Sequence, residues 1–184
     1  GKGVKGVRLL SCQIFKTVGG KSYSGSTAQA IKWAADHGAV IINNSWGYTY
    51  DENQDGKLTG SELTRALNAT ISDSDKAAVD YFIKRAGYDA KGNQVGPMAG
   101  GVVIFAAGND GIANGAPANY EPVIAVGATD ANLKKSSFSN YGDWVDIAAP
   151  GSSILSTMPG GKYGTLDGTS MACPHVTGIA ALLV

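Results

Sequence analysis

The apolar positions of the chain gather in short runs, and each run predicts a buried β-strand. In the run VVIFAA the apolar residues are continuous rather than alternating, which is typical of a parallel sheet that is covered on both faces. The predicted strands lie at about residues 7–14 and 39–44, in GGVVIFAAGN (100–109) and EPVIAVGATD (121–130), and in the shorter segments WVDIAAPG (144–151) and SSILST (152–157).

Helical patterns with recognisable start and stop residues lie between several of these strands. The segment STAQAIKWAADHG begins at Ser26, which can cap a helix together with Gln29, and it stops at Gly38. Further helices are predicted in SELTRALNAT and SDSDKAAVDYFIKRAG, and a last one opens at Thr169 or Ser170. The segment VGGKSYSG is predicted to be a loop or an irregular edge segment.

The alternation of strands and helices predicts an α/β fold, a three-layer, mostly parallel and doubly wound sheet. Residues 51–98 interrupt the alternation with an acidic loop and two helical stretches, so we expect an insert there within one domain that covers residues 1–184. In such sheets active sites collect beyond the carboxyl ends of the strands. The segments at those ends are NNSWG, AAGNDG and GATD.

The two ends of the sequence suggest a piece of a larger fold. The chain enters its first predicted strand almost at once, and its last residues, VTGIAALLV, lie within an apolar helix that lacks a terminal glycine or a polar exit. We therefore expect the sheet to be incomplete because an N-terminal portion is absent. Targeting segments could then have been encoded elsewhere.

Charge and composition make two classes of partner improbable. The 15 Lys and Arg residues balance the 15 Asp and Glu residues, which removes the electrostatic basis for binding nucleic acid or an anionic membrane surface. No apolar run approaches the ~20 residues of a membrane span. The two cysteines, Cys12 and Cys173, lie far apart in sequence and are predicted to be free buried thiols rather than a disulfide.

The stretch LDGTSMACPH places Ser170 between small residues at a predicted helix start. A serine there is commonly only a helix cap. It could also be a nucleophile, because N–H groups at a helix start carry partial positive charge and Gly168 allows a substrate to approach closely. The motif is one residue away from the G-x-S-x-G of α/β-hydrolases, but that family needs an acid and a histidine further along the chain, and residues 171–184 contain no Asp or Glu.

Three stretches favour the nucleophile: INNSWG (42–47), FAAGNDG (105–111) and DGTSMACPHVTGIAAL (167–182). Together they resemble the subtilisin-like serine proteases, the subtilases, and the last is close to that family's serine signature, G-T-S-M-A-x-P-H-V-x-G. The resemblance covers nearly the whole chain except the insert. It implies a serine endopeptidase that hydrolyses peptide bonds of peptide or protein substrates through an acyl-enzyme.

The resemblance also implies roles for individual residues. Ser170 would be the nucleophile, and Asn109 would donate a hydrogen bond to the oxyanion together with the Ser170 N–H. The remaining positions would bind substrate: Ser45, Trp46 and Gly47 as one wall of the main specificity pocket, Ala106, Ala107 and Gly108 as the other wall, and Gly20, Lys21 and Ser22 as the opposite substrate-binding edge.

Two members of the catalytic triad are missing from the sequence. Subtilases carry the aspartate in D-[ST]-G and the histidine in H-G-T-H, and neither motif occurs here. His37 and His175 occupy other contexts, so we expect this polypeptide alone to be inactive and the Asp and His to lie in a missing N-terminal segment, which could also be a separate chain. By resemblance the complete enzyme would be secreted or attached to the cell envelope and could be made with a propeptide. A non-catalytic, calcium-dependent binding module on a protease scaffold is the alternative.

The insert contains a candidate calcium loop, DENQDGKLTGSE (51–62), which fits the pattern D-x-[DN]-x-[DN]-G-x₅-E at every defined position. Ca²⁺ prefers six to eight oxygen ligands. The predicted ligands are the side chains of Asp51, Asn53, Asp55, Thr59 and Glu62 and the backbone carbonyl of Lys57. The segment before the loop does not resemble a helix, so the prediction is half of an EF-hand, and a solvated acidic turn is the alternative.

Overall fold

The computed structural model describes residues 6–184, and the chain divides into two compact units. The first unit consists of the residues up to Ile42 with Ser72–Val103 and Ala180–Val184, and the second consists of Asn43–Ile71 and Ile104–Ile179. A four-stranded sheet has the order β3 (Ile41–Asn44), β4 (Val102–Ala106), β5 (Ile124–Thr129) and β6 (Ile147–Pro150). The pairs β4–β5 and β5–β6 are parallel, which confirms the predicted α/β class with a parallel sheet.

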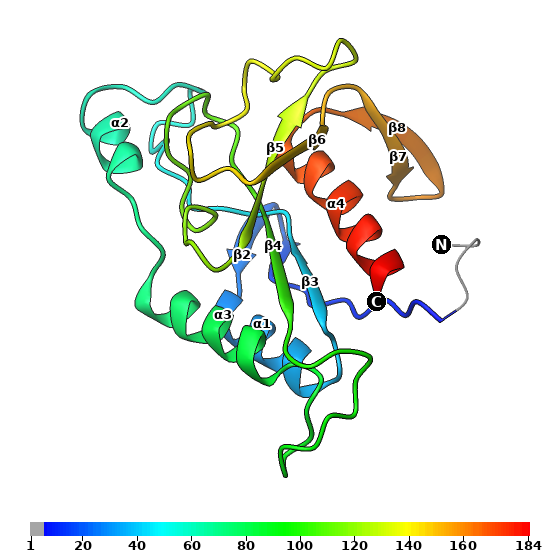
Figure 1. The fold of residues 1–184 in the computed structure, drawn as a ribbon. Coiled ribbons are helices and arrows are strands. Elements are labelled where there is room, and N and C mark those ends of the chain that lie inside the picture. The colour runs from blue at the N-terminus through cyan, green and yellow to red at the C-terminus, as the bar shows by residue number, and fades with distance from the viewer. Residues whose placement is uncertain (1–5) are drawn as a thin grey trace. The chain divides into compact units, whose positions relative to one another are not determined.

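Two helices pack together in the first unit, α1 (Thr27–Asp36) and α3 (Asp73–Arg85), as Figure 1 shows. The Ser26 side chain accepts a hydrogen bond from the Gln29 N–H at 3.2 Å, so the predicted cap is confirmed. Thr27 Oγ1 donates to the buried carboxylate of Asp75 at 2.5 Å, which joins the starts of the two helices. The core between the helices includes Ile31, Val79 and Phe82, all at most 1% exposed.

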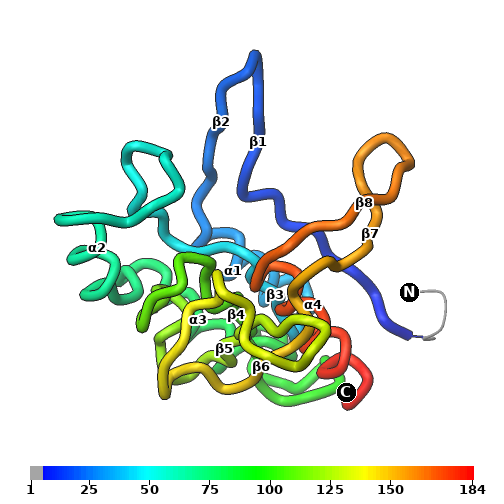
Figure 2. The backbone as a smooth tube through the Cα atoms, turned by 90° about the horizontal axis from the view of Figure 1, so that it is seen from above, coloured from blue at the N-terminus to red at the C-terminus, as the bar shows by residue number. Residues whose placement is uncertain are grey.

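The N-terminal part of the first unit differs from the prediction. Residues 7–14 form no strand, and Leu9 is 90% exposed, so the predicted buried strand is wrong. The segment predicted as a loop instead forms a hairpin of β1 (Phe15–Val18) and β2 (Lys21–Ser24), visible in Figure 2 as a narrow projection. Gly19 and Gly20 both have positive φ, as the tightest hairpin turns require. An apolar run becomes a strand only where a partner strand is available.

The second unit contains α2 (Gly60–Leu67), the antiparallel hairpin of β7 (Ile154–Met158) and β8 (Lys162–Leu166), and most of α4 (Thr169–Leu183). Its core includes Phe105, Val126 and Cys173, none of them exposed. The start of α4 is where the sequence predicts it. Strand β8 was not predicted, because its residues, KYGTL, carry only a short and weak apolar pattern.

The segment 51–98 is divided between the two units. Helix α3 follows β3 and precedes β4, and these two strands are neighbours in the sheet. The helix therefore takes part in the alternation of strands and helices, and the extent of the predicted insert stays a prediction. Only the stretches before and after it, including α2 in the second unit, depart from that alternation.

Candidate functional site

Ser170 lies in the first turn of α4 and is held by the segment that follows β3. The Ser45 hydroxyl donates to the Ser170 carbonyl at 2.9 Å, and the Ser170 hydroxyl donates to the Ser45 carbonyl at 3.3 Å. The residue four positions after Ser170 is Pro174, which has no N–H to donate to the Ser170 carbonyl. The hydroxyl of Ser45 supplies the missing donor and thereby links the two segments.

The carboxamide of Asn109 is fixed in one orientation by Thr169. The Thr169 N–H and hydroxyl both donate to Asn109 Oδ1, at 2.8 and 2.9 Å, and the Gly108 N–H donates to Thr169 Oγ1 at 3.1 Å. Thr169 is completely buried, which protects this network from water. Because Oδ1 is engaged by two donors, the amide group Nδ2 must point to the other side.

Two N–H groups meet at one point beside Gly168. A Cβ atom added to Gly168 would lie 3.5 Å from Asn109 Nδ2 and 3.6 Å from the Ser170 backbone nitrogen. Gly168 has a φ of +152°, a backbone conformation that favours glycine. Because Gly168 has no side chain, the space beside its Cα is open. Two hydrogen-bond donors border this space, Asn109 Nδ2 and the backbone N–H of Ser170. This arrangement is able to stabilise negative charge on a carbonyl oxygen.

Each histidine ring contacts the backbone carbonyl of the residue four positions before it. His175 Nδ1 contacts the Met171 carbonyl at 2.8 Å on the exposed side of α4. His37 belongs to the first unit, where its ring stacks on Trp33 with centroids 3.8 Å apart. Within the described residues, the Ser170 hydroxyl has a backbone carbonyl as its hydrogen-bond partner rather than a base.

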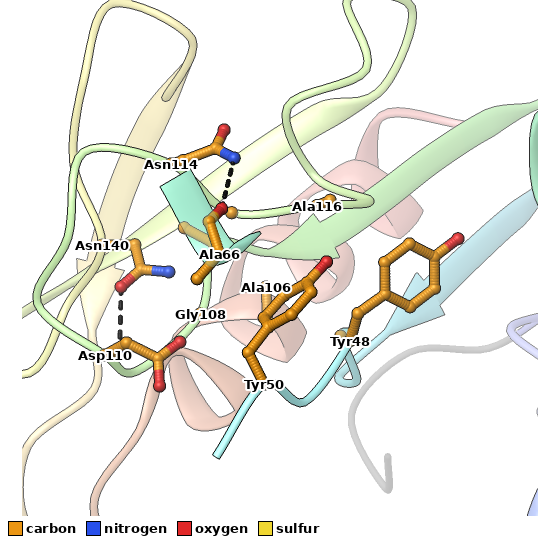
Figure 3. A pocket seen from close by; sticks show the side chains of 12 residues that line it. Tyr48, Tyr50, Ala66, Ala106, Gly108, Asp110, Asn114, Ala116 and Asn140 are labelled. Carbon is orange, nitrogen blue, oxygen red and sulfur yellow. Dashed lines mark hydrogen bonds between the residues drawn. The ribbon is translucent and has the colours of Figure 1, made fainter. Parts of the chain in front are cut away.

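A shallow depression, partly open to solvent, lies in the second unit and is shown in Figure 3. Four of the six predicted wall residues line it, namely Gly47, Ala106, Ala107 and Gly108. Ser45 and Trp46 do not. The Trp46 indole packs edge-on against Phe105, with ring centroids 5.1 Å apart, and donates to Asn44 Oδ1 at 3.1 Å. Trp46 thus packs on the sheet, and its substrate-binding role stays a prediction.

Eight further residues line the pocket that the sequence analysis did not assign to it: Tyr48, Tyr50, Ala66, Asp110, Asn114, Gly115, Ala116 and Asn140. Asp110 directly follows Asn109 in the segment AAGNDG, which was the available signal. Burial raises the pKa of the Asp110 carboxyl, a hydrogen bond with Asn140 partly lowers it, and the charge of Asp51 raises it further. The acidic loop thus lies close enough to the pocket for the charge of Asp51 to act on the Asp110 carboxyl, and both residues belong to the second unit.

In the predicted calcium loop, carboxylate side chains accept hydrogen bonds from backbone N–H groups of the same loop. The carboxylate of Asp51 accepts from the N–H groups of Asp55 and Gly56, at 3.2 and 2.8 Å, and Gly56 has a φ of +77°. The carboxylate of Glu62, only 5% exposed, accepts from Asn53 Nδ2 at 3.3 Å and from two backbone N–H groups. The donor set contains only oxygens, which suits Ca²⁺. Within residues 6–184, however, no three His, Cys, Asp or Glu side chains gather to hold a metal ion.

The predicted substrate-binding edge lies in the first unit. Gly20 is in the turn of the β1–β2 hairpin, and Lys21 and Ser22 pair with Val18 and Thr17. These residues belong to a different unit from Ser170, and their role stays a prediction.

Both cysteines are free thiols, as predicted, but only Cys173 is fully buried. Cys173 Sγ lies 4.0 Å from the Asn44 carbonyl oxygen. Burial raises the pKa of the Cys173 thiol to about 11, so the thiol is neutral at physiological pH and is a packing group rather than a second nucleophile.

Among the described helices, none combines the length and the apolar character that a membrane crossing requires.

Comparison with known proteins agrees with the geometry of the site. A model of the subtilase family matches residues 1–184. A thermophilic serine proteinase from Bacillus sp. (strain AK1) is 58% identical over 177 residues, which are 96% of this chain and 35% of that protein. Thermitase from Thermoactinomyces vulgaris is 38% identical over 176 residues, which are 95% of this chain and 50% of that protein.

Solved structures give the same result. The prenylagaramide maturation protease PagA has a TM-score of 0.63 and 34% identity, covering 85% of this chain and 47% of that chain. A cold adapted subtilisin-like serine proteinase has a TM-score of 0.59 and 30% identity, covering 87% and 48%. The chain thus spans between about a third and a half of the length of these relatives. On its sequence match and its fold, the chain belongs to the subtilase family of serine proteases.

Proposed function

We propose that this chain supplies the nucleophile and the oxyanion donors of a serine endopeptidase. The observation that carries the proposal is the meeting of Asn109 Nδ2 and the Ser170 N–H beside Gly168. A peptide carbonyl oxygen in that space would accept hydrogen bonds from both donors while the Ser170 oxygen bonds to the carbonyl carbon. The negative charge that develops on the oxygen is what such donors stabilise.

The reaction then follows the acyl-enzyme course. The tetrahedral intermediate collapses, the carbon–nitrogen bond breaks, and the amine leaves with a proton. The acyl group stays on Ser170 as an ester until water hydrolyses it, which restores the serine. The bond between Thr169 and Asn109 Oδ1 keeps the carboxamide oriented throughout, so the donor needs no reorganisation as charge develops.

The base for these proton transfers is proposed to lie outside the 184 residues. Two observations support this: the sequence contains neither H-G-T-H nor D-[ST]-G, and the chain spans only 35% and 50% of two matched relatives. The missing segment would carry the triad Asp and His, in the same polypeptide or as a separate chain. We also propose, from family membership, that the complete enzyme acts outside the cell or in its envelope and is made with a propeptide.

The isolated chain is expected to be inactive. Without a base the serine hydroxyl stays neutral and is a poor nucleophile, and removal of a triad member leaves only about 10³–10⁴-fold catalysis over water. A fluorophosphonate probe, with labelling followed by intact mass, is expected to show no burst at Ser170 in the 184-residue chain and rapid labelling in the full-length protein. A Ser170→Ala variant of the full-length protein is the control. Rapid labelling of the isolated chain would contradict this expectation.

We further propose that residues 51–62 bind one Ca²⁺ ion. Support comes from the twelve-residue pattern, the oxygen-only donor set and the left-handed turn at Gly56. The carboxylates of Asp51 and Glu62, which now accept N–H groups, would exchange part of those contacts for the ion. Bound Ca²⁺ would neutralise their repulsion and order the loop.

Calorimetry of the chain titrated with CaCl₂ is expected to show one binding event that is lost in Asp55→Ala. Replacement of the exposed Asp143 by Ala leaves the loop intact and is expected to leave the heat unchanged. Binding to the folded state should also raise the melting temperature in proportion to the logarithm of the free Ca²⁺ concentration. Equal and negligible heats for the chain and for Asp55→Ala would end the calcium proposal.

A further inference from the structure

The side chain of Asn140 is polar and yet lies in the interior, where the residue is only 3% exposed. Its Oδ1 atom accepts two backbone N–H groups, from Asp110 at 2.9 Å and from Ile112 at 3.2 Å. Figure 3 shows the first of these bonds as a dashed line. One buried acceptor thus holds two backbone groups of the segment that follows Asn109.

The backbone of Asn140 bonds to the residue on the other side of Asn109. The Asn140 N–H donates to the Gly108 carbonyl at 3.0 Å. A Cβ atom added to Gly108 would lie 2.3 Å from Asn140 Nδ2, so the two segments approach as closely as a glycine allows. Asn140 therefore bonds to the residue before Asn109 and, through its side chain, to the residue after it.

Asn140 is itself fixed to the sheet of the second unit. The hydroxyl of Ser139, which is completely buried, donates to the Asn140 carbonyl at 3.1 Å and accepts from the Ala128 N–H of β5 at 3.0 Å. A further backbone bond runs from the Gly111 N–H to the Phe138 carbonyl at 2.8 Å. The segment that carries Asn140 is thus tied to β5 on one side and to the segment of Asn109 on the other.

Asn109 is exposed, so packing in the core does not determine where it lies. The end of its side chain is held by Thr169, whose N–H and hydroxyl donate to Oδ1 and set the orientation of the carboxamide. The position of Nδ2 relative to the Ser170 N–H also depends on the backbone from which the side chain starts. That backbone is held through Gly108 and Asp110, and both of these bond to Asn140.

We propose that Asn140 is a positioning residue, which holds the backbone on both sides of Asn109 and thereby places the Asn109 Nδ2 donor beside the oxyanion space. The proposal rests on the proposed peptidase function and deepens it, because an oxyanion donor stabilises the transition state only from the correct position. A displacement of about 1 Å at a reacting centre can cost ~10² in rate. Asn140 acts through Asn109 and does not touch the reacting atoms.

The first test needs no catalysis and uses the 184-residue chain. NMR signals of the Asn109 side-chain amide and of the Thr169 backbone amide are compared between the unchanged chain, Asn140→Ala and Ser136→Ala. Ser136 is a matched control, because it is only 4% exposed, belongs to the same segment and pairs its hydroxyl with Ser152 Oγ at 2.7 Å. Both signals are expected to shift in Asn140→Ala and to stay in place in Ser136→Ala.

Unchanged Asn109 and Thr169 signals in a folded Asn140→Ala chain would overturn the proposal and would leave the peptidase function untouched. Removal of a buried acceptor from two N–H groups destabilises the fold, so the melting temperature is measured first. If Asn140→Ala does not fold, Asn140→Ser takes its place in both tests. Serine keeps an oxygen acceptor on a shorter side chain, and the same shifts are expected.

The second test measures kcat and KM of the full-length enzyme with a fluorogenic peptide. Asn140→Ala is expected to lower kcat about tenfold with little change in KM, a smaller loss than the ~10²–10³ that removal of the donor itself costs. Ser136→Ala is expected to lower the melting temperature and to retain kcat. An unchanged kcat in Asn140→Ala, or a change in KM alone, would overturn the positioning role.

A double variant separates positioning of Asn109 from a general structural effect. Asn109→Ala combined with Asn140→Ala is expected to have the same kcat as Asn109→Ala alone, because no carboxamide is left to be positioned. A purely structural role would lower kcat by the same factor on both backgrounds, and that result would overturn the proposal. Absence of cleavage even by the unchanged enzyme, with the expected NMR shifts, would instead count against the proposed function.

Discussion

Replacing Gly168 by alanine is expected to abolish catalysis in the full-length enzyme while leaving the fold intact. The new methyl group would lie 3.5 Å from Asn109 Nδ2 and 3.6 Å from the Ser170 nitrogen, in the space proposed for the carbonyl oxygen. Both donors would then be denied to the oxygen, so the loss of kcat should reach at least the ~10²–10³ that removal of one donor costs. Steady-state kinetics with a fluorogenic peptide measures this loss, and circular dichroism reports the fold.

A suitable control for Gly168→Ala is a glycine-to-alanine substitution at another residue with positive φ that lies away from the proposed oxyanion space. Gly160 also has a positive φ, +79°, but a methyl group there would meet nothing within 4 Å. Gly160→Ala is therefore expected to reduce stability slightly and to leave kcat near that of the unchanged enzyme. If Gly168→Ala were as active as Gly160→Ala, the oxygen could not occupy the space beside Gly168.

Asn109→Ala is expected to lower kcat by about 10²–10³ with little change in KM, because an oxyanion donor acts mainly in the transition state. The substitution also removes the acceptor for the Thr169 N–H and hydroxyl, so part of the effect could arise from a displaced Thr169. Asn109→Asp separates the two contributions, since it keeps the Oδ1 acceptor for Thr169 but replaces the Nδ2 donor by an oxygen. A similar loss in both variants is the expected result.

Asn132→Ala is the matched control for the asparagine series, because Asn132 lies on an exposed turn of the second unit, away from the pocket lining. It should retain full activity. The donor assignment would be contradicted by an Asn109→Asp enzyme with nearly normal kcat. In that case the Asn109 carboxamide would serve only to anchor Thr169.

Local signals in the sequence predicted the helices well. Ser26 and Gly38 bracket α1, and the glycine-rich stretch before Ser170 marks the start of α4. Caps and glycines act within one turn of chain, so their effect can be derived without knowledge of the tertiary fold.

Strand prediction failed where pairing depends on distant residues. Residues 7–14 have the apolar run of a strand but form none, whereas β1 and β8 form because a neighbouring segment of the same hairpin offers backbone groups. Helix α3 was assigned to an insert because the acidic loop precedes it. In the structure it lies in sequence between β3 and β4, which are neighbours in the sheet, and packs against α1.

For the candidate site too, local motifs predicted some residues, whereas the contacts between them depend on the tertiary fold. Ser170 and Asn109 were predicted from motifs, since the chemistry of the two side chains can be read from residue types. Their relation to Gly168, Thr169 and Ser45 involves contacts across 60 and 125 positions of sequence. Asp110 and Tyr50 were missed as pocket residues for the same reason, because the pocket is bordered by segments that are far apart in the sequence.

The amino-acid sequence by itself determined the family and the starts of the helices, and it predicts the nucleophile and the donor set of the acidic loop, because these follow from residue types at short spacings. Only the tertiary structure decided which segments pair as strands, that two N–H donors lie beside Gly168, and that residues of two distant segments line one pocket. Those properties depend on distances between groups far apart in the chain, and such distances arise only when the chain has folded.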